Sequence, residues 1–169
     1  MDERVDQPLI EKGRSFKTAA VEMAGRNWLV AKLLHEGLEV AIPSVDRGID
    51  LIAFREVGDA GIQALPLQLK CAEKQRFSLR TKYENRGILL VYIWNVFVSP
   101  EAYILNYKEA EKELGARATG TDSWNRGHYV YSRISPDLQR RLDHYKNDWD
   151  RLRRELDSRA VSGQLSASA

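Results

Sequence analysis

Residues 48–54 read GIDLIAF and residues 65–71 read LPLQLKC, and these two stretches decide the fold. Both are short and apolar, and the second alternates leucine with other residues in the two-residue period of a β-strand. Two glycines in the segment between them predict a hairpin loop that joins neighbouring strands. Because residues two apart on a strand project from the same face, Gln68 and Lys70 point the same way, and the hairpin brings Asp50 opposite them.

The chain before these strands predicts a helix. Across residues 15–36 the apolar side chains recur at helical spacing and lie on or near one face. Ser15 is suited to cap the first turn and Gly37 to end the last one, since glycine enters the left-handed conformation without a side-chain penalty. Residues 1–14 are polar without a clear period, and we expect a flexible arm there. Residues 38–42 predict a short strand.

A buried strand follows the hairpin after a charged segment. Residues 88–94, ILLVYIW, are the longest apolar run and predict a strand buried on both faces. The charged residues 72–86 before it predict a loop or an irregular helix. After it, residues 102–105 predict a short strand, and Asn106 and Glu109 form a variant of the capping box at the start of a helix.

The C-terminal part of the chain predicts one more strand and a long helix. Residues 116–127 are a polar loop, and residues 128–134 alternate aromatic and polar side chains as a strand does. The helix begins with a serine cap and a proline, and its apolar residues follow a heptad stripe to residue 157. The stripe favours intramolecular core, and dimerisation through it stays open. Residues 158–169 are small and polar, and we expect a disordered tail.

Strands interrupted by helices, with a buried central strand, predict an α/β fold with a mixed sheet. The chain has 169 residues, of which 43% are hydrophobic and 30% charged, which suits one domain. We place that domain at residues 15–157, with a core at 15–115 and a C-terminal extension at 128–157. The chain contains neither an apolar run of membrane-spanning length nor an apolar signal core, and it has a single cysteine, so we expect a cytoplasmic protein without a membrane partner. The formal net charge of +2 gives no support for nucleic-acid binding from bulk charge.

Asp50, Gln68 and Lys70 form the constellation that can carry chemistry. A carboxylate, an amide oxygen and an ammonium group on one sheet face suit a hard divalent cation with a charge-stabilising or proton-transfer group beside it. The backbone carbonyl of Leu69 adds another oxygen, and Glu22 lies in the predicted helix. Lys70 and Glu22 also have purely structural interpretations. A strand lysine is commonly a solvated side chain, and Glu22 stands four residues before an arginine, which is the spacing of a helix ion pair.

The order of these features resembles the PD-(D/E)XK nuclease superfamily. A helix with an acidic residue precedes GIDLIA, a hairpin and LQLK, as in the Holliday-junction resolvase-like and Mrr-like branches. The resemblance implies a restriction endonuclease-like α/β/α sandwich with a central mixed sheet, followed here by the long C-terminal helix. It implies that Asp50 is the central metal-binding aspartate, that Lys70 is the catalytic lysine, and that Glu22 acts on the metal through a bound water. Gln68 departs from the usual Asp or Glu, because its oxygen can ligate magnesium but brings no charge.

The activity implied by this resemblance is Mg²⁺- or Mn²⁺-dependent hydrolysis of DNA phosphodiester bonds. Asp50, Gln68 and the Leu69 carbonyl would hold the ion, and Lys70 would orient water or stabilise charge in the transition state. The alternative is a catalytically weak or inactive module of the same fold that binds DNA or a protein partner in a DNA-processing or defence system, and a larger complex stays open. The basic residues that follow the site either contact phosphates or form a solvated charged loop: Lys74, Arg76, Arg80, Lys82 and Arg86.

Overall fold

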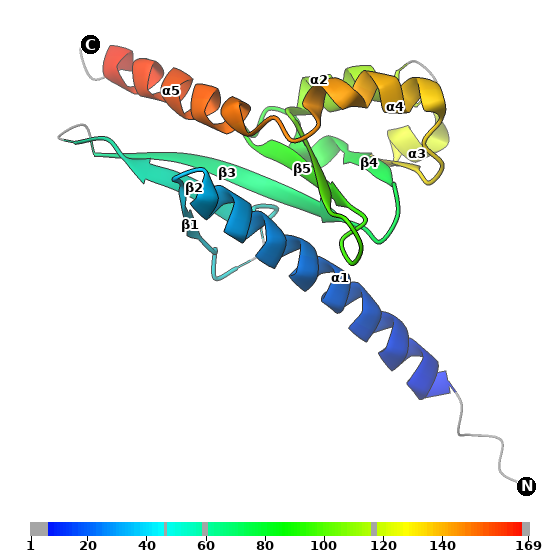
Figure 1. Cartoon of the computed structure of the whole chain (residues 1–169). Helices are drawn as coiled ribbons and strands as arrows, with labels where there is room; N and C mark the ends of the chain where they lie inside the picture. The colour runs from blue at the N-terminus through cyan, green and yellow to red at the C-terminus, as the bar shows by residue number, and fades with distance from the viewer. Residues whose placement is uncertain (1–6, 46, 59–60, 116–117, 167–169) are drawn as a thin grey trace, which may run out of the picture.

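The computed structural model describes residues 7–45, 47–58, 61–115 and 118–166 (Figure 1). Its helices are α1 (Gln7–His35), α2 (Tyr107–Leu114), α3 (Asp122–Asn125), α4 (Pro136–Leu142) and α5 (Trp149–Ser166), with 3-10 turns at η2 (Thr81–Tyr83) and η3 (Asp143–Tyr145). Its strands are β1 (Glu39–Ala41), β2 (Leu51–Glu56), β3 (Ile62–Cys71), β4 (Phe77–Arg80), β5 (Leu89–Trp94), β6 (Glu101–Leu105) and β7 (His128–Tyr131).

Five of these strands form one mixed sheet in the order β1-β2-β3-β5-β6. Strands β3 and β5 run parallel, and the other neighbours run antiparallel. The predicted α/β class with a mixed sheet is therefore confirmed. Every residue of β5 is buried, as its continuous apolar run predicts. Alternate side chains of this strand enter two separate cores, so that Val91 faces α1 and α5 whereas Tyr92 faces the opposite layer.

Two layers cover the sheet. On one face α1 and α5 pack side by side, with the rings of Trp28 and Trp149 5.9 Å apart between centroids. On the other face lie α2, α4 and a two-stranded sheet made of β4 and β7. The hydroxyl of Tyr92 fastens β4 to the main sheet by donating to the backbone carbonyl of Ser78 at 2.7 Å. Within the described ranges, no helix has the length and apolar character needed to cross a bilayer.

Helix α1 is longer than the sequence predicts. It begins at Gln7, so residues 7–14 are helical rather than a flexible arm, and Ser15 is not its N-cap. Pro8 falls in the first turn, where its missing N–H is not needed for helical hydrogen bonding. The first six residues of the predicted arm lie outside the described ranges.

The segment at residues 72–86 is not the predicted loop or irregular helix throughout, because it contains β4 and η2. Buried Phe77 and Leu79 alternate with polar side chains in β4, but an alternation over four residues is too short to distinguish a strand from a loop. The strand predicted within residues 128–134 is present as β7. It pairs with β4 and does not join the main sheet.

Helix caps near the middle of the chain follow local sequence. Asn106 accepts a hydrogen bond from the backbone N–H of Glu109 at 2.9 Å, and the Glu109 carboxylate accepts the Asn106 N–H at 2.8 Å, which confirms the predicted capping box. The polar loop predicted at residues 116–127 contains the short helix α3. The hydroxyl of Thr121 caps this helix by accepting the N–H of Trp124 at 3.2 Å.

The single helix predicted up to residue 157 is wrong, because the chain divides it into α4 and α5. Asn147 lies between them with a φ of 52°, a left-handed conformation that interrupts a helix. Its side-chain oxygen accepts the N–H of Ala102 at 3.1 Å, and its own N–H donates to the Ala102 carbonyl at 2.7 Å. The break is thus stabilised by β6, which lies far away in the sequence.

This break divides the heptad stripe between the two cores. Leu138 and Leu142 pack in the core that contains Tyr92, whereas Leu152 and Leu156 pack against α1. All four side chains are at most 3% exposed, so the stripe is intramolecular core. Helix α5 continues to Ser166, so the first part of the predicted disordered tail is helical, and residues 167–169 lie outside the described ranges.

Candidate functional site

The candidate site lies at the end of β3 that extends beyond its pairing with β2. Strand β2 begins at Leu51, which pairs with Leu67, so residues 68–71 of β3 have an open edge on that side. The chain before β2 closes part of this edge. The N–H of Asp50 donates to the Leu67 carbonyl at 2.8 Å, and a carboxylate oxygen of Asp50 accepts the N–H of Leu69 at 2.6 Å. The pairing of β2 with β3 therefore fixes the Asp50 carboxylate beside the strand, as predicted.

Gln68 lies beside this carboxylate with only 6% of its surface exposed. Its side-chain nitrogen Nε2 donates to Oδ2 of Asp50 and to the backbone carbonyl of Leu69, the latter at 3.2 Å. Its side-chain oxygen Oε1 is buried and accepts no hydrogen bond within the described part of the chain. A buried acceptor left without a donor costs roughly 1–3 kcal/mol, so this orientation of the carboxamide carries a penalty.

A half-turn of the Gln68 carboxamide would place Oε1 where Nε2 now lies. Three oxygens, from Gln68, Asp50 and the Leu69 carbonyl, would then converge on one point, and their mutual repulsion would need a cation between them. Magnesium takes such carboxylate and carbonyl oxygens together with water. The residues therefore suit Mg²⁺ or Mn²⁺ in the turned state. The described residues include no cluster of three or more His, Cys, Asp or Glu side chains that could bind a metal; the donors at this edge also include an amide and a backbone carbonyl.

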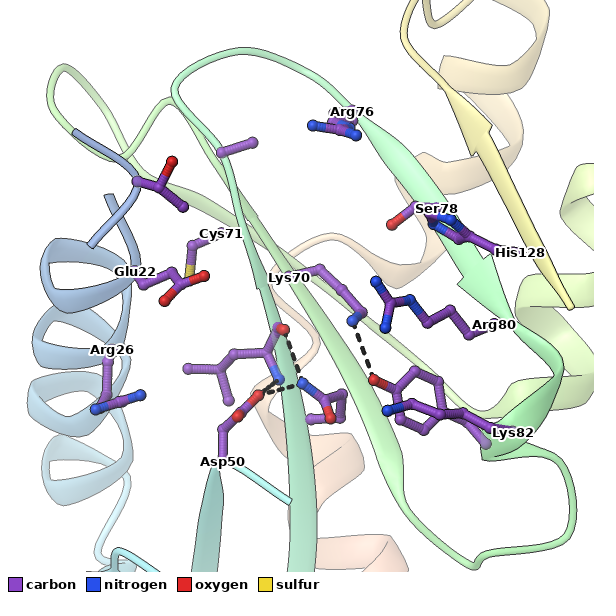
Figure 2. A pocket seen from close by; sticks show the side chains of 15 residues that line it. Glu22, Arg26, Asp50, Lys70, Cys71, Arg76, Ser78, Arg80, Lys82 and His128 are labelled. Atoms are coloured by element: carbon purple, nitrogen blue, oxygen red, sulfur yellow. Dashed lines mark hydrogen bonds between the residues drawn. The ribbon is translucent and has the colours of Figure 1, made fainter. Parts of the chain in front are cut away.

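Lys70 projects on the same side of β3 as Gln68, as the two-residue period predicts. Its ammonium nitrogen donates to the hydroxyl of Tyr83 at 3.2 Å and lies 4.9 Å from the centre of the Tyr83 ring. The ammonium group of Lys82 lies 5.1 Å from the same ring. Figure 2 shows the Lys70 side chain directed toward Arg80 and Lys82, across the strand from Asp50. Two ammonium groups therefore gather around one buried tyrosine.

Glu22 reaches the site because α1 packs unusually close to β3. A Cβ atom at Gly25 would lie 2.9 Å from the Cβ of Cys71, a separation that packed side chains do not tolerate. Glycine allows this approach and brings Glu22, nearly one turn earlier, to the wall of the cleft (Figure 2). No ion pair joins Glu22 to Arg26 within the described ranges, so the structural interpretation from helix spacing is not supported.

The cleft has a volume of about 510 Å³ and brings all four predicted chemical residues together, namely Glu22, Asp50, Gln68 and Lys70. Leu69 also lines the cleft, and its carbonyl accepts a hydrogen bond from Gln68. A groove of about 410 Å³ adjoins the cleft and shares Glu22 and Cys71 with it.

The two sides of the cleft differ in charge: one carries Glu22 and Asp50 together with Arg26, whereas Arg76 and Arg80 line the other. Burial, followed by the negative charges of Asp50 and Glu22, raises the pKa of the Cys71 thiol to about 12. On the other wall, the pKa of His128 is lowered, first by burial and then by the positive charges of Arg80, Lys70 and Arg76. A thiol with a pKa this high stays protonated at neutral pH, which argues against Cys71 as a nucleophile.

The five basic residues predicted to contact phosphates separate into three groups. Arg76, Arg80 and Lys82 line the cleft. Lys74 lines the adjoining groove instead. Arg86 is outside the described lining of both, and it donates to the backbone carbonyl of Arg47 at 2.9 Å, which supports the loop that leads to Asp50.

Sequence reasoning missed several side chains that line the cleft. His128 comes from β7, far along the chain, and no local spacing connects it with Lys70. Ser78 and Tyr83 lie in a segment without a recognisable period. Arg26 was interpreted as an ion-pair partner, whereas its Nε atom is buried and makes no hydrogen bond within the described ranges. The local signal for Ser78 is the alternation from Phe77 to Arg80, which at four residues is too short to identify a strand.

Comparisons with family models, with curated proteins and with solved structures each return no match to this chain.

Proposed function

We propose that this protein is a metal-dependent nuclease that hydrolyses DNA phosphodiester bonds, with a restriction endonuclease-like α/β/α sandwich of the PD-(D/E)XK type. One observation carries the proposal. The Asp50 carboxylate, the Gln68 carboxamide and the Leu69 carbonyl meet at the open edge of β3, and Lys70 lies on the same strand. The sheet order and the acidic side chain on α1 are further support. We place this activity in the cytoplasm.

The ion in this proposal is Mg²⁺ or Mn²⁺. Asp50, the turned Gln68 carboxamide and the Leu69 carbonyl would hold it directly, and Glu22 on α1 would hold it through a water molecule. When bound, such an ion polarises a phosphate and lowers the pKa of a neighbouring water. Gln68 contributes a neutral oxygen, so affinity depends mainly on the two carboxylates.

The chain's own cations act on the substrate. The Lys70 ammonium group lies on the floor of the cleft, where it would stabilise the negative charge that develops on the phosphate in the transition state or orient the attacking water. Arg80 and Lys82 would hold the phosphate backbone on the same wall, since guanidinium and ammonium groups provide most backbone contacts to nucleic acid. Tyr83 holds the Lys70 ammonium group by accepting its hydrogen bond at 3.2 Å.

The test is cleavage of plasmid, linear, branched and single-stranded DNA, with Mg²⁺, with Mn²⁺ and with chelator. We expect metal-dependent cleavage of at least one substrate, and its loss in Lys70→Ala and Asp50→Ala. Lys112→Ala, on an exposed position of α2, is the matched control and should cleave normally. Circular dichroism checks that each variant is folded. Cleavage that survives in both site variants would overturn the proposal.

A DNA-binding module without cleavage is the second candidate. It is favoured by the present orientation of Gln68, whose amide donates to the carboxylate that a metal would need. This candidate predicts that the protein binds DNA but cleaves none of the substrates with either metal.

A further inference from the structure

The two-stranded sheet of β4 and β7 presents one face to the cleft. In its register, Ser78 pairs with Val130 and Arg80 pairs with His128. Phe77 and Leu79 turn the other way and are at most 1% exposed in the core beneath. Because side chains alternate along a strand, Ser78, Arg80 and His128 share the opposite face. All three line the cleft (Figure 2).

Arg76 lies directly before β4, two residues ahead of Ser78, and it also lines the cleft. The resulting donor set contains two guanidinium groups, a hydroxyl and an imidazole. Among the described residues that line the cleft, the acidic side chains are Glu22 and Asp50, which belong to α1 and to the segment before β2. Arg26 on α1 also lines the cleft, so the α1 side carries both signs of charge, whereas the described lining residues of the β4–β7 side include no acidic side chain.

A wall of guanidinium, hydroxyl and imidazole groups suits a phosphate. Guanidinium groups bind phosphate through two parallel hydrogen bonds, and hydroxyl groups and imidazoles add further donors. The wall lies beside the Gln68–Asp50 edge and does not include it. A phosphate bound to the wall would therefore be a different phosphate from the one at the proposed metal position.

We propose that the cleft-facing side of the β4–β7 ribbon, formed by Arg76, Ser78, Arg80 and His128, is a second phosphate subsite that binds the phosphate next to the scissile one in a DNA strand. The inference rests on the proposed function in identifying the ligand as DNA. It goes beyond that function because the binding itself requires no metal and no cleavage.

The environment of His128 gives this subsite a pH signature. The charges that act on His128 are those of Arg80, Lys70 and Arg76. The other charged and titratable groups that line the same cleft are Lys82 and Tyr83 from η2, Cys71 from β3, Glu22 and Arg26 from α1, and Asp50 before β2. With its pKa below the ordinary value, His128 is neutral at pH 7 in the free protein. A bound phosphate offsets the surrounding positive charge and raises that pKa, so the complex takes up a proton. Affinity for DNA therefore increases as the pH falls through the pKa of the complex, and it levels off below the pKa of the free protein.

The experiment is fluorescence anisotropy with a fluorescein-labelled 12-nucleotide DNA, single-stranded and as a duplex, in chelator so that no cleavage occurs. We expect Arg80→Gln to weaken binding at least about threefold and to lower the slope of log affinity against log salt by about one. The matched control is Arg140→Gln on α4, whose side chain is 76% exposed and outside the described lining of the cleft. It should leave both quantities unchanged.

The pH arm uses His128→Gln, which keeps a hydrogen-bond donor but cannot titrate. Wild-type affinity should rise between pH 7.5 and pH 5.5, and this rise should be smaller in the variant. The subsite is refuted if Arg80→Gln changes affinity and salt slope no more than Arg140→Gln, or if His128→Gln retains the full pH dependence. The binding measurements test the subsite independently of the cleavage assay that tests the proposed nuclease. A wild-type protein that cleaves DNA while ribbon variants bind normally refutes the subsite alone, and one that never cleaves but loses binding in these variants refutes only the nuclease.

Discussion

Gln68 donates a hydrogen bond from its carboxamide nitrogen to the carboxylate oxygen of Asp50 that also accepts the N–H of Leu69. The same nitrogen donates to the Leu69 carbonyl, while the carboxamide oxygen stays buried without a donor in the described part of the chain. The amide nitrogen thus bridges two oxygens in the way a cation would. Metal binding and this hydrogen bond are mutually exclusive.

The first prediction concerns the charge of residue 68. Gln68→Glu removes the donor that bridges the oxygens and supplies a second anionic ligand beside Asp50, so affinity for Mn²⁺ should rise by at least about tenfold, which corresponds to about 1.4 kcal/mol. Without metal the two carboxylates repel each other, and the melting temperature should fall below that of the wild type. Added Mn²⁺ should reverse this loss. Isothermal calorimetry and thermal melts measure both effects.

The control for that experiment is Gln63→Glu on the same strand. Gln63 accepts a hydrogen bond from Arg55 at 2.9 Å at the other end of β3, and a glutamate can accept the same bond. Its metal affinity should equal that of the wild type. Equal affinity in Gln68→Glu and Gln63→Glu would show that the β3 edge does not hold the ion.

The second prediction tests the close approach of α1 to β3. Gly25→Ala improves helix propensity by about 1 kcal/mol, but its Cβ would lie 2.9 Å from the Cβ of Cys71 and 3.4 Å from a methyl group of Val96. Overpacking typically costs about 1–3 kcal/mol, which should exceed the gain in helix propensity, so the free energy of unfolding should fall. Urea denaturation measures it. Adding Cys71→Ala removes the sulfur atom from the contact and should recover part of the loss; no recovery would mean that the strain lies elsewhere.

The third prediction concerns the reactivity of Cys71. Burial, together with the charges of Asp50 and Glu22, raises the pKa of this thiol from 9.0 to about 12. At pH 8 the reactive thiolate is therefore roughly a thousandfold scarcer in the native protein than in the unfolded chain. A thiolate with a higher pKa is also a stronger nucleophile, so labelling by a chromogenic disulfide should be slower by a smaller factor, roughly thirtyfold, and the native rate should keep rising above pH 9, where the unfolded chain levels off. A native rate within tenfold of the unfolded rate at pH 8 would contradict this environment.

The fourth prediction concerns the turn that separates α4 from α5. Asn147→Ala loses the bond to the Ala102 N–H and places alanine at a φ of 52°, so it should destabilise the fold by about 2 kcal/mol. Asn147→Gly loses the same hydrogen bond but adopts that conformation freely, and it should cost less. Chemical denaturation compares the two variants. Equal losses would mean that backbone conformation contributes nothing at this turn.

Local periodicity was enough to predict much of the main sheet. The alternation in LPLQLKC and the continuous run ILLVYIW each identify a strand, and the pairing of β2 with β3 follows from the short hairpin. The same local rules failed at Asn147, where a bond to a distant strand overrides helix propensity. They also failed at the N-terminal end of α1, which begins at Gln7, and at the C-terminal end of α5, which continues to Ser166.

The candidate site was predictable in part for the same reason. Asp50, Gln68 and Lys70 lie on a hairpin, so spacing alone brings them together. His128 reaches the cleft only through the pairing of β7 with β4, which no local pattern encodes. The sequence could not predict the orientation of the Gln68 carboxamide either. That orientation is set by the hydrogen bonds that its nitrogen donates to Asp50 and to the Leu69 carbonyl in the folded chain.

Pairing between β4 and β7 also has a consequence for biosynthesis. The Gln68–Asp50 edge is complete once the first half of the chain has emerged from the ribosome, but β4 has its strand partner only after Tyr131 has been made. Domains form as their segments emerge from the N-terminal end, so the positively charged wall is among the last parts to assemble. A nascent or truncated chain that ends before β7 would carry the proposed metal ligands without the complete proposed phosphate subsite. The proposed binding of nucleic acid would therefore depend on the synthesis of β7.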